Sequence, residues 1–294
     1  MMKPLVFIAP EQKDLGEEII RLSGAEPAVY TQRPFPDGET YTRVFSDVRG
    51  RVCVLISCLA PPDNAFLPLY FLCSLLRDMG SGRIILVAPY LPYLRQDKAF
   101  QEGEAVSSVY FARCVSGICD ELVTIDPHLH RITDLKVVYD IPCVVLETAG
   151  LIAGFINDRF AQPLLIGPDE ESEQWVSRIA MLSAAPYCML KKQRLGDRLV
   201  KMDADIPPEY IQYTPVITDD IISSGTTVME AARHIRQAGM KTPACAVIHP
   251  LFAGDAFQKL QAGGIDVYSC NTIPHVSNRM DIAPLVAEYI KGIS

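Results

Sequence analysis

The chain has 294 residues, of which 49% are apolar and 21% are charged, a composition that excludes disordered and collagen-like classes. Its formal net charge of −8 disfavours broad nucleic-acid binding, because affinity for phosphate backbones comes from clustered Lys and Arg. No apolar run reaches the roughly 18 residues that span a bilayer, and the nine cysteines include no CxxC pair. We therefore expect a cytoplasmic protein in a reducing compartment, with neither nucleic acid nor membrane as partner.

Short apolar and β-branched runs alternate with segments of helical periodicity along the chain. The runs predict strands over Pro4–Ala9, Arg51–Ser57, Arg83–Pro89, Glu121–Ile125, Cys143–Leu146, Pro163–Gly167, Pro215–Thr218, Ala244–His249 and Ile265–Ser269. Apolar residues at three- and four-residue steps predict helices over Asn64–Met79, Ser107–Ser116, Glu173–Ser183 and Thr227–Ala238. This alternation is typical of an α/β fold with mainly parallel sheets flanked by helices.

The β-α-β rhythm restarts near residue 145, and the predicted strands are too many for one sheet of modest width. We predict two similar α/β domains, residues 1–145 and 146–294. A weak internal similarity favours a duplication, since RIILVAPYLPY (83–93) and ACAVIHPLFAG (244–254) are both apolar strands that lead into a proline-containing loop. The alternating charges and breakers of Lys191–Glu209 indicate a mobile loop or a hairpin.

The segment with the strongest chemistry is PVITDDIISSGTTVME (215–230), in which an apolar strand, two acids and a small-residue turn precede an amphipathic helix. The turn consists of Ser223, Ser224, Gly225, Thr226 and Thr227. Its backbone N–H groups would point toward an anion at the positive end of the helix dipole. Asp219 and Asp220 can accept hydrogen bonds from a vicinal diol or help to hold a metal ion. A pentose 5-phosphate satisfies both halves of the segment.

This segment resembles the ribose-phosphate loop of the phosphoribosyl pyrophosphate synthetases (ribose-phosphate pyrophosphokinases), which phosphoribosyltransferases share. FPDGE (35–39) resembles the family's nucleotide loop, and PYLPYLRQDKAFQEGEAVS (89–107) resembles its ATP-contacting Arg-Gln-Asp stretch. DPHLHRI (126–132) resembles its metal-site motif, GPDEESEQWVSRIA (167–180) its Pro-Asp segment, and KKQRLGD (191–197) its catalytic basic loop. The resemblance covers most of the chain and implies two phosphoribosyltransferase-like domains, the first with the ATP motifs and the second with the ribose-phosphate loop.

The implied reaction transfers the β,γ-pyrophosphoryl group of ATP to the anomeric hydroxyl of ribose 5-phosphate, which gives phosphoribosyl pyrophosphate and AMP. The implied ATP-binding residues are Phe35, Asp37, Glu39, Arg95, Gln96 and Asp97. In this scheme Phe35 stacks on adenine, and Arg95 binds the phosphates through its planar guanidinium. The family's nucleotide loop reaches a neighbouring subunit's site, so the resemblance also implies a homo-oligomer with a shared active site.

The resemblance further implies a magnesium cofactor at His128 and Asp169. Because Mg²⁺ prefers oxygen ligands, Asp169 is the expected principal ligand. Lys192 and Arg194 correspond to the basic pair that neutralises the transferring group in the transition state. Lys191 is the alternative to Lys192, and we favour Lys192 on the alignment.

The departures from the family pattern lie around the sugar. Thr226 stands where the family has the second glycine of its loop, and Glu170-Glu171-Ser172 follow Asp169 where the family has small residues. A paralogue that uses another sugar phosphate, such as ADP-ribose, and a catalytically silent regulatory homologue therefore stay as alternatives. A phosphoribosyltransferase is disfavoured, because FPDGE and the Arg-Gln-Asp stretch have no use in one. Oligomer number and control by phosphate or ADP are left open.

Overall fold

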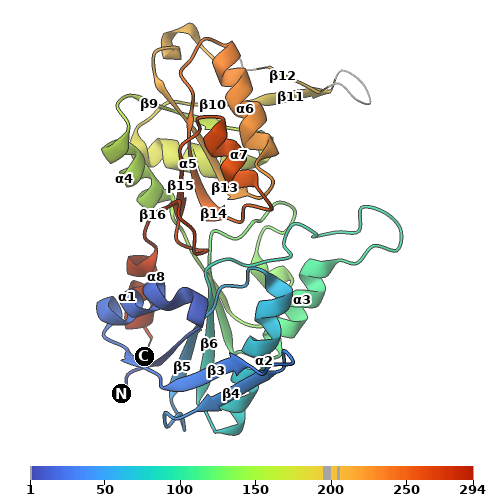
Figure 1. The fold of residues 1–294 in the computed structure, drawn as a ribbon, viewed down its shortest axis with the longest axis vertical. Coiled ribbons are helices and arrows are strands. Elements are labelled where there is room, and N and C mark those ends of the chain that lie inside the picture. Colours follow the sequence, from blue (N-terminus) through green and yellow to red (C-terminus); the bar gives the residue numbers. More distant parts are fainter. Residues whose placement is uncertain (1, 195–199, 204–205, 294) are drawn as a thin grey trace. The chain divides into compact units, whose positions relative to one another are not determined.

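A computed structural model describes residues 2–194, 200–203 and 206–293, and in 191–203 it describes the backbone alone. The chain forms two compact units: unit 1 comprises residues 1–146 and 282–294, and unit 2 comprises residues 147–281. Each unit contains a six-stranded sheet flanked by helices (Figure 1). None of the helices in the described ranges has the length and apolarity needed to cross a lipid bilayer.

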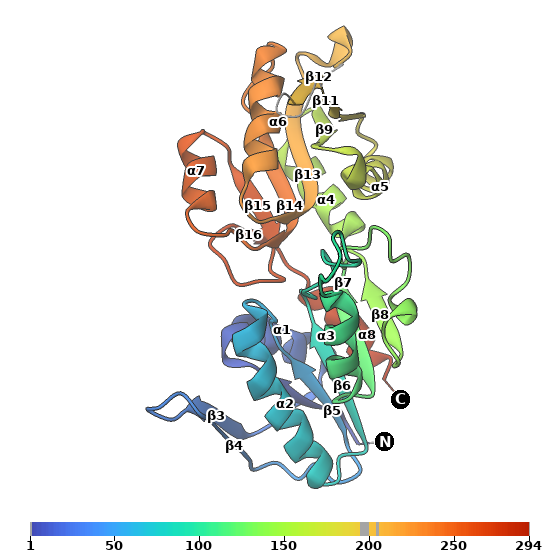
Figure 2. The ribbon, with the colours of Figure 1, turned by 90° about the vertical axis from the view of Figure 1, so that its right-hand side faces the viewer.

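The sheet of unit 1 is fully parallel, with strand order β2-β1-β5-β6-β7-β8. Its strands are β1 Leu5–Ile8, β2 Glu26–Pro27, β5 Val52–Ile56, β6 Arg83–Ala88, β7 Glu121–Ile125 and β8 Cys143–Leu146. Its helices are α1 Lys13–Ser23, α2 Pro62–Asp78, α3 Ser107–Ser116 and α8 Ala283–Lys291. An antiparallel hairpin, β3 Tyr30–Pro34 and β4 Thr40–Val44, interrupts the chain between β2 and β5 and projects from the sheet (Figure 2).

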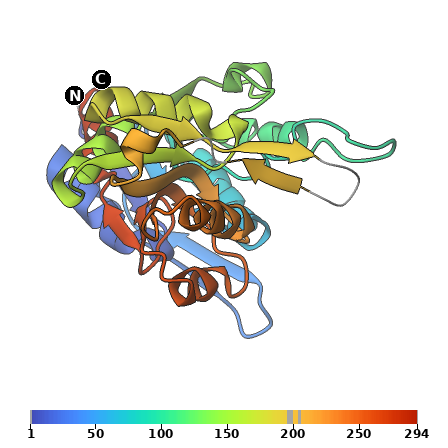
Figure 3. The ribbon, with the colours of Figure 1, turned by 90° about the horizontal axis from the view of Figure 1, so that it is seen from above.

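The sheet of unit 2 is also fully parallel, with strand order β10-β9-β13-β14-β15-β16. Its strands are β9 Pro163–Gly167, β10 Tyr187–Met189, β13 Thr214–Ile222, β14 Ala244–Pro250, β15 Val267–Cys270 and β16 Asn278–Met280. Its helices are α4 Ala149–Arg159, α5 Glu173–Ser183, α6 Thr226–Gln237 and α7 Ala256–Ala262. A second antiparallel hairpin, β11 Lys191–Arg194 and β12 Val200–Asp203, leaves the sheet between β10 and β13 (Figure 3).

The two units repeat one topology. In each, the first strand has the second strand on one side and the strand after the hairpin on the other, so the winding direction reverses between β1 and β5 and between β9 and β13. The similar segments 83–93 and 244–254 contain β6 and β14, which occupy the same position in the two sheets. The topology therefore confirms the prediction of two similar domains.

The chain's last helix belongs to the first unit. Helix α8 packs on α1, and in the same manner α4, which follows β8, packs on α5 of unit 2. Each sheet thus has a helix that comes from the end of the other repeat. From the sequence we expected residues 146–294 to form one domain. The observed break after residue 146 lies one residue from the expected boundary. Residues 282–294, however, belong to unit 1, because the apolar face of α8, including Val286 and Ile290, is buried there.

The apolar runs in the sequence are uninterrupted because the central strands of each sheet are buried on both faces. A parallel sheet covered on both faces buries successive residues of a strand, and β5 and β6 accordingly have almost no exposed side chains. On one face of unit 1, Leu55 and Leu86 pack against Leu72 and Leu76 of α2. In unit 2, Ile217 and Val247 pack against Ile235 of α6.

The predicted elements are found with small shifts, and others were not predicted. The strand predicted at Pro215–Thr218 continues to Ile222, and α6 begins at Thr226, one residue before the predicted start. Helix α4 was not predicted because its sequence is apolar around most of its circumference. The β3–β4 hairpin was not predicted because its residues are half-exposed or exposed and largely polar. The β11–β12 hairpin lies within Lys191–Glu209, where a hairpin was one of the two expectations.

We expect Val286→Ala, at a fully buried position of α8, to lower the free energy of unfolding by about 1–3 kcal/mol through lost apolar burial. Hydrogen exchange followed by mass spectrometry should show faster exchange in α1 and β1 and unchanged exchange in β9 and β13. Glu288→Ala, whose side chain is 80% exposed, is the control and should change the unfolding free energy by less than about 0.5 kcal/mol. Faster exchange confined to unit 2 would contradict the assignment of α8.

Candidate active site

The turn between β13 and α6, which is the predicted anion recess, directly precedes the start of α6. Gly225 is the N-cap of α6 with φ of 72°, and a Cβ at this position would lie 3.4 Å from Leu260 Cδ1. The left-handed backbone therefore favours glycine here, whereas the contact with α7 would be an ordinary one. The exposed hydroxyls of Ser224 and Thr226 are 3.1 Å apart and lie on the outer side of the turn.

Two backbone hydrogen bonds join the start of this turn to the segment after β14. Ser223 O accepts a hydrogen bond from Ala253 N at 2.9 Å, and Ile222 O accepts one from Phe252 N at 3.0 Å. These bonds fix the carbonyl groups toward the segment after β14, and within the turn Thr226 N donates to Ser224 Oγ at 3.4 Å. The helix start thus has the arrangement that binds phosphate in other proteins. The predicted turn at the start of α6 is found, and its binding of an anion stays a prediction.

Three carboxylates lie near the ends of two neighbouring strands of unit 2, β9 and β13. Asp219 and Asp220 belong to the last four residues of β13, and Asp169 follows β9, its hydrogen-bonded neighbour. Asp219 is partly buried, and desolvation together with the negative charges of Asp220 and Asp169 raises its pKa well above the ordinary value. Such a cluster favours a bound cation or a ligand rich in hydroxyl donors.

Asp169 is fixed by a capping box. Its Oδ1 accepts a hydrogen bond from Ser172 N at 3.2 Å, and the Ser172 hydroxyl donates to Asp169 O at 2.7 Å. Glu170 and Glu171 are exposed in the first turn of the short 3-10 segment that follows. The capping role of Ser172 was not recognised from sequence, although its Asp-x-x-Ser spacing is a capping signal.

The FPDGE segment is the tight loop of the β3–β4 hairpin. Phe35 N donates to Glu39 O at 2.7 Å, Gly38 with φ of 94° closes the turn, and Glu39 N donates to Asp37 Oδ1 at 3.2 Å. The Phe35 ring is 39% exposed and meets Tyr41 edge-on, with ring centroids 5.8 Å apart. Arg33 lies over the Phe35 ring, 5.2 Å from its centroid. The hairpin therefore presents a preformed aromatic surface and two carboxylates at its tip.

The Arg-Gln-Asp stretch lies between β6 and α3. Arg95 is exposed, whereas the Asp97 side chain is 3% exposed and accepts a hydrogen bond from Arg131 Nη1 at 2.9 Å. Arg131 belongs to the DPHLHRI segment and was not singled out from the sequence; its position in that motif was the available signal. The ion pair joins the ATP-contacting stretch to the metal-site segment, and Gln96 O accepts from Ser108 N of α3 at 3.3 Å.

The remaining predicted residues lie on separate elements. His128 follows β7 in unit 1 and is partly buried, whereas Asp169 belongs to unit 2. Lys192 and Arg194 lie on β11, opposite Met202 and Val200 of β12, so the predicted basic loop is a hairpin. The side chains of both residues fall outside the described part of the structure, as do residues 195–199.

The donor set of unit 2 fits magnesium. Asp169, Asp219 and Asp220 offer hard oxygen ligands. Within the described residues, no three His, Cys, Asp or Glu side chains already converge on one metal position. Magnesium commonly retains water and takes further oxygen atoms from substrate phosphates, so two or three carboxylates suffice for the protein's share.

We expect Asp219→Asn to raise the stability of the ligand-free protein. Because the folded-state pKa of Asp219 lies above its unfolded value, the folded state holds more protons between the two values, and stability falls as the pH rises through that window. The variant should have a higher urea midpoint than wild type at neutral pH and should lack this fall.

Asp158→Asn, an exposed change in the same unit, should leave the urea midpoint and its pH dependence unchanged. A lower midpoint for Asp219→Asn at neutral pH would show that the carboxylate stabilises the fold and would contradict the repulsion inferred here.

Comparison with known proteins agrees with these features. Residues 5–118 match the family described as the N-terminal domain of ribose phosphate pyrophosphokinase, and residues 134–280 match the phosphoribosyl transferase domain. The ribose-phosphate pyrophosphokinase of Methanopyrus kandleri is 32% identical over 99% of both chains, and that of Methanobrevibacter smithii is 30% identical over 95% of this chain and 97% of its own. The crystal structure of a phosphoribosylpyrophosphate synthetase from Mycobacterium smegmatis has the same fold, with a TM-score of 0.87 at 23% identity over 99% of this chain and 98% of its own. The chain belongs to the ribose-phosphate pyrophosphokinase family.

Proposed function

We propose that this protein transfers the β,γ-pyrophosphoryl group of ATP to the anomeric hydroxyl of ribose 5-phosphate, and that it does so with magnesium in the cytoplasm. The reaction forms a bond between the anomeric oxygen and the β-phosphorus, breaks the bond from that phosphorus to the α-phosphate, and releases AMP and a proton. Its product, phosphoribosyl pyrophosphate, is an activated sugar for nucleotide biosynthesis.

One observation carries the proposal: the recess of turn N–H groups at the start of α6 directly follows Asp219 and Asp220. The recess suits the 5-phosphate dianion, because each N–H bond to a charged oxygen contributes about 1.5–3 kcal/mol. The carboxylates suit the sugar's vicinal hydroxyls as acceptors. A pentose 5-phosphate has these two groups at opposite ends of one small molecule.

The ATP-binding role rests on the hairpin tip and the Arg-Gln-Asp stretch. The exposed Phe35 ring offers a stacking surface for adenine, and Asp37 and Glu39 offer acceptors for its amino group. The exposed guanidinium of Arg95 can bind phosphate oxygens in bidentate fashion, with Gln96 as an amide contact. The buried Asp97 acts through Arg131, so we assign it a positioning role for the segment that contains His128.

Magnesium is proposed as the cofactor, held by Asp169 and, directly or through water, by His128. When bound, the ion would neutralise charge on the phosphate oxygens. Lys192 and Arg194 supply further positive charge, and they lie two residues apart on β11. The exposed thiol of Cys114 is compatible with the reducing compartment that we propose.

The proposal is tested by supplying purified protein with ATP and magnesium, and with ribose 5-phosphate or ADP-ribose as acceptor. We expect AMP as the stoichiometric nucleotide product and higher kcat/KM for ribose 5-phosphate. Stoichiometric ADP would indicate phosphoryl transfer instead, and a kcat/KM for ADP-ribose more than about tenfold higher, which is 1.4 kcal/mol, would reassign the acceptor. No turnover with either acceptor would indicate a silent homologue.

Lys192→Ala and Arg194→Ala should each lower kcat by a factor on the order of 10², because their contacts strengthen mainly in the transition state. The KM for ATP should change by less than about threefold. Lys191→Ala is the matched control on the same strand and should retain near wild-type kcat. A raised KM at unchanged kcat would make the pair ground-state binders, and a larger kcat loss in Lys191→Ala would reassign the lysine.

We also propose a homo-oligomer in which the FPDGE loop of one subunit serves the site of another. Phe35→Ala and Asp220→Asn should each reduce activity strongly on their own. Oligomers reassembled from both variants should regain part of the activity, since some sites then combine an intact Phe35 with an intact Asp220. Full activity in a monomeric size-exclusion fraction would rule out a shared site.

A further inference from the structure

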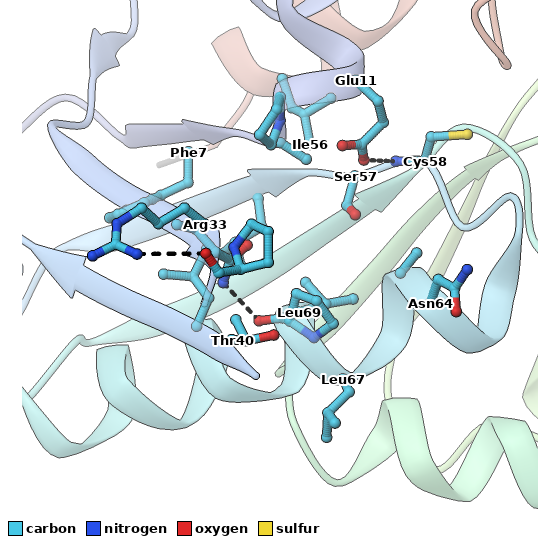
Figure 4. Close-up of a pocket in the computed structure, with 18 of the residues that line it drawn as sticks. Phe7, Glu11, Arg33, Thr40, Ile56, Ser57, Cys58, Asn64, Leu67 and Leu69 are labelled. Carbon is cyan, nitrogen blue, oxygen red and sulfur yellow. Dashed lines mark hydrogen bonds between the residues drawn. The ribbon is translucent and has the colours of Figure 1, made fainter. Parts of the chain in front are cut away.

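Unit 1 contains a cavity of about 620 Å³ beneath the β3–β4 hairpin. Its floor is formed by the ends of β1 and β5, one wall by α2 and the other by the hairpin, as Figure 4 shows. The apolar part of the lining includes Phe7, Leu55, Leu69 and Leu72. A cavity of this size falls within the range of small-molecule sites, about 300–1,000 Å³.

The cavity lies at the point where the winding of unit 1 reverses. Strands β1 and β5 are neighbours in the sheet and correspond to β9 and β13 of unit 2, whose ends hold the acids and the anion recess. In doubly wound sheets, ligands bind outside the carboxyl ends of the strands at this reversal. The cavity therefore occupies, in unit 1, the position of the proposed sugar-phosphate site in unit 2.

The chemistry of the two positions differs. In unit 2 the segment between strand and helix is Ser-Ser-Gly before Thr226, with N–H groups at every residue; in unit 1, Pro61 and Pro62 stand at the start of α2 and have no N–H group. Two carboxylates, Glu11 and Asp63, line the unit 1 cavity. Arg33 and Asn64 also line the cavity, but the start of α2 offers fewer backbone donors than the β13–α6 turn and the two carboxylates oppose an anion, so we expect phosphorylated ligands to bind less well there.

The polar groups of the cavity favour a neutral ligand with N–H or O–H donors. Glu11 Oε1 accepts a hydrogen bond from Cys58 N at 3.3 Å, and Asp63 Oδ1 accepts from the Tyr93 hydroxyl, which leaves each carboxylate one further oxygen. Ser57 is 6% exposed and lines the cavity, and its hydroxyl points into the open space (Figure 4). A hydroxyl in this position can donate a hydrogen bond to a ligand or accept one from it.

We propose that this cavity binds an uncharged heteroaromatic molecule of nucleoside size, with its flat faces against the leucine and phenylalanine side chains and its donors toward Glu11, Ser57 and Asp63. The cavity adjoins the proposed nucleotide loop, because Gly38 of FPDGE and the neighbouring Thr40 line it, but its existence does not depend on the proposed activity. Because the hairpin that forms one wall also carries the FPDGE loop, the occupant would contact the base of the proposed nucleotide loop.

The test is equilibrium dialysis of the full-length protein with labelled adenosine as the probe, in saturating AMP and magnesium so that a catalytic nucleotide site is filled. We expect about one adenosine per chain that AMP does not displace. Ser57→Ala should weaken its binding about three- to tenfold, the value of one hydrogen bond. Thr40→Phe, on the hairpin wall, should weaken it by more than tenfold by filling the cavity.

Two control variants show whether a loss of adenosine binding arises in the cavity or from a general effect on the protein. Ser74→Ala on α2 and Thr31→Phe on the exposed side of the hairpin do not line the cavity and should change adenosine binding by less than about twofold. Absence of adenosine binding, complete displacement by AMP, or equal effects of Ser57→Ala and Ser74→Ala would each overturn the proposal. An intact adenosine site in a protein that makes no AMP from ATP would contradict the proposed function alone.

Discussion

The pairing of β9 with β13 is the constraint on which the site of unit 2 depends. Parallel neighbours end at the same edge of a sheet, so residues far apart in sequence, Asp169 after β9 and Asp219 near the end of β13, become neighbours there. The winding reverses between these strands, which leaves their ends uncovered by a crossover connection. The helix that follows β13 then adds its N-terminus to the same edge. The pairing of β9 with β13 in this register therefore brings the acids and the predicted anion recess to one edge of the sheet.

The same constraint acts in unit 1 with a different outcome. Strands β1 and β5 end side by side at the corresponding reversal, but prolines follow β5 where Ser, Gly and Thr follow β13. One duplicated fold therefore provides a recess of N–H donors in unit 2 and an apolar cavity in unit 1. The hairpins inserted at equal positions, β3–β4 and β11–β12, carry the proposed ATP loop and the proposed basic pair.

Much of this arrangement could be predicted from the sequence. The buried strands were predictable because parallel sheets covered on both faces need uninterrupted apolar runs, and the family was predictable because its motifs occur in order; the comparisons confirm the family and the two-domain fold. The extent of β13 was not predictable, because a strand that continues through Asp219 and Asp220 breaks the apolar pattern. The placement of α8 in unit 1 was not predictable either, since periodicity identifies an apolar face but not the sheet that buries it.

The side-chain contacts within the candidate site were the hardest feature to predict from the sequence. Asp97 was predicted as an ATP contact, yet its carboxylate is buried against Arg131, a pairing that depends on two loops meeting after β6 and β7. Likewise, Glu170 and Glu171 stand where the family has small residues, and the sequence did not show that both are exposed beside an Asp169 capped by Ser172. The site residues themselves are still predictions.

The central claim is that the 5-phosphate of the acceptor binds at the turn between β13 and α6 and not at the corresponding turn of unit 1. Amide NMR of deuterated protein titrated with ribose 5-phosphate tests it most directly. The account predicts the largest shifts at the N–H groups of Ser224, Gly225, Thr226 and Thr227, with small shifts at Ser57 and Cys58. Largest shifts in the segment between β5 and α2, with those of the β13–α6 turn unchanged, would contradict it.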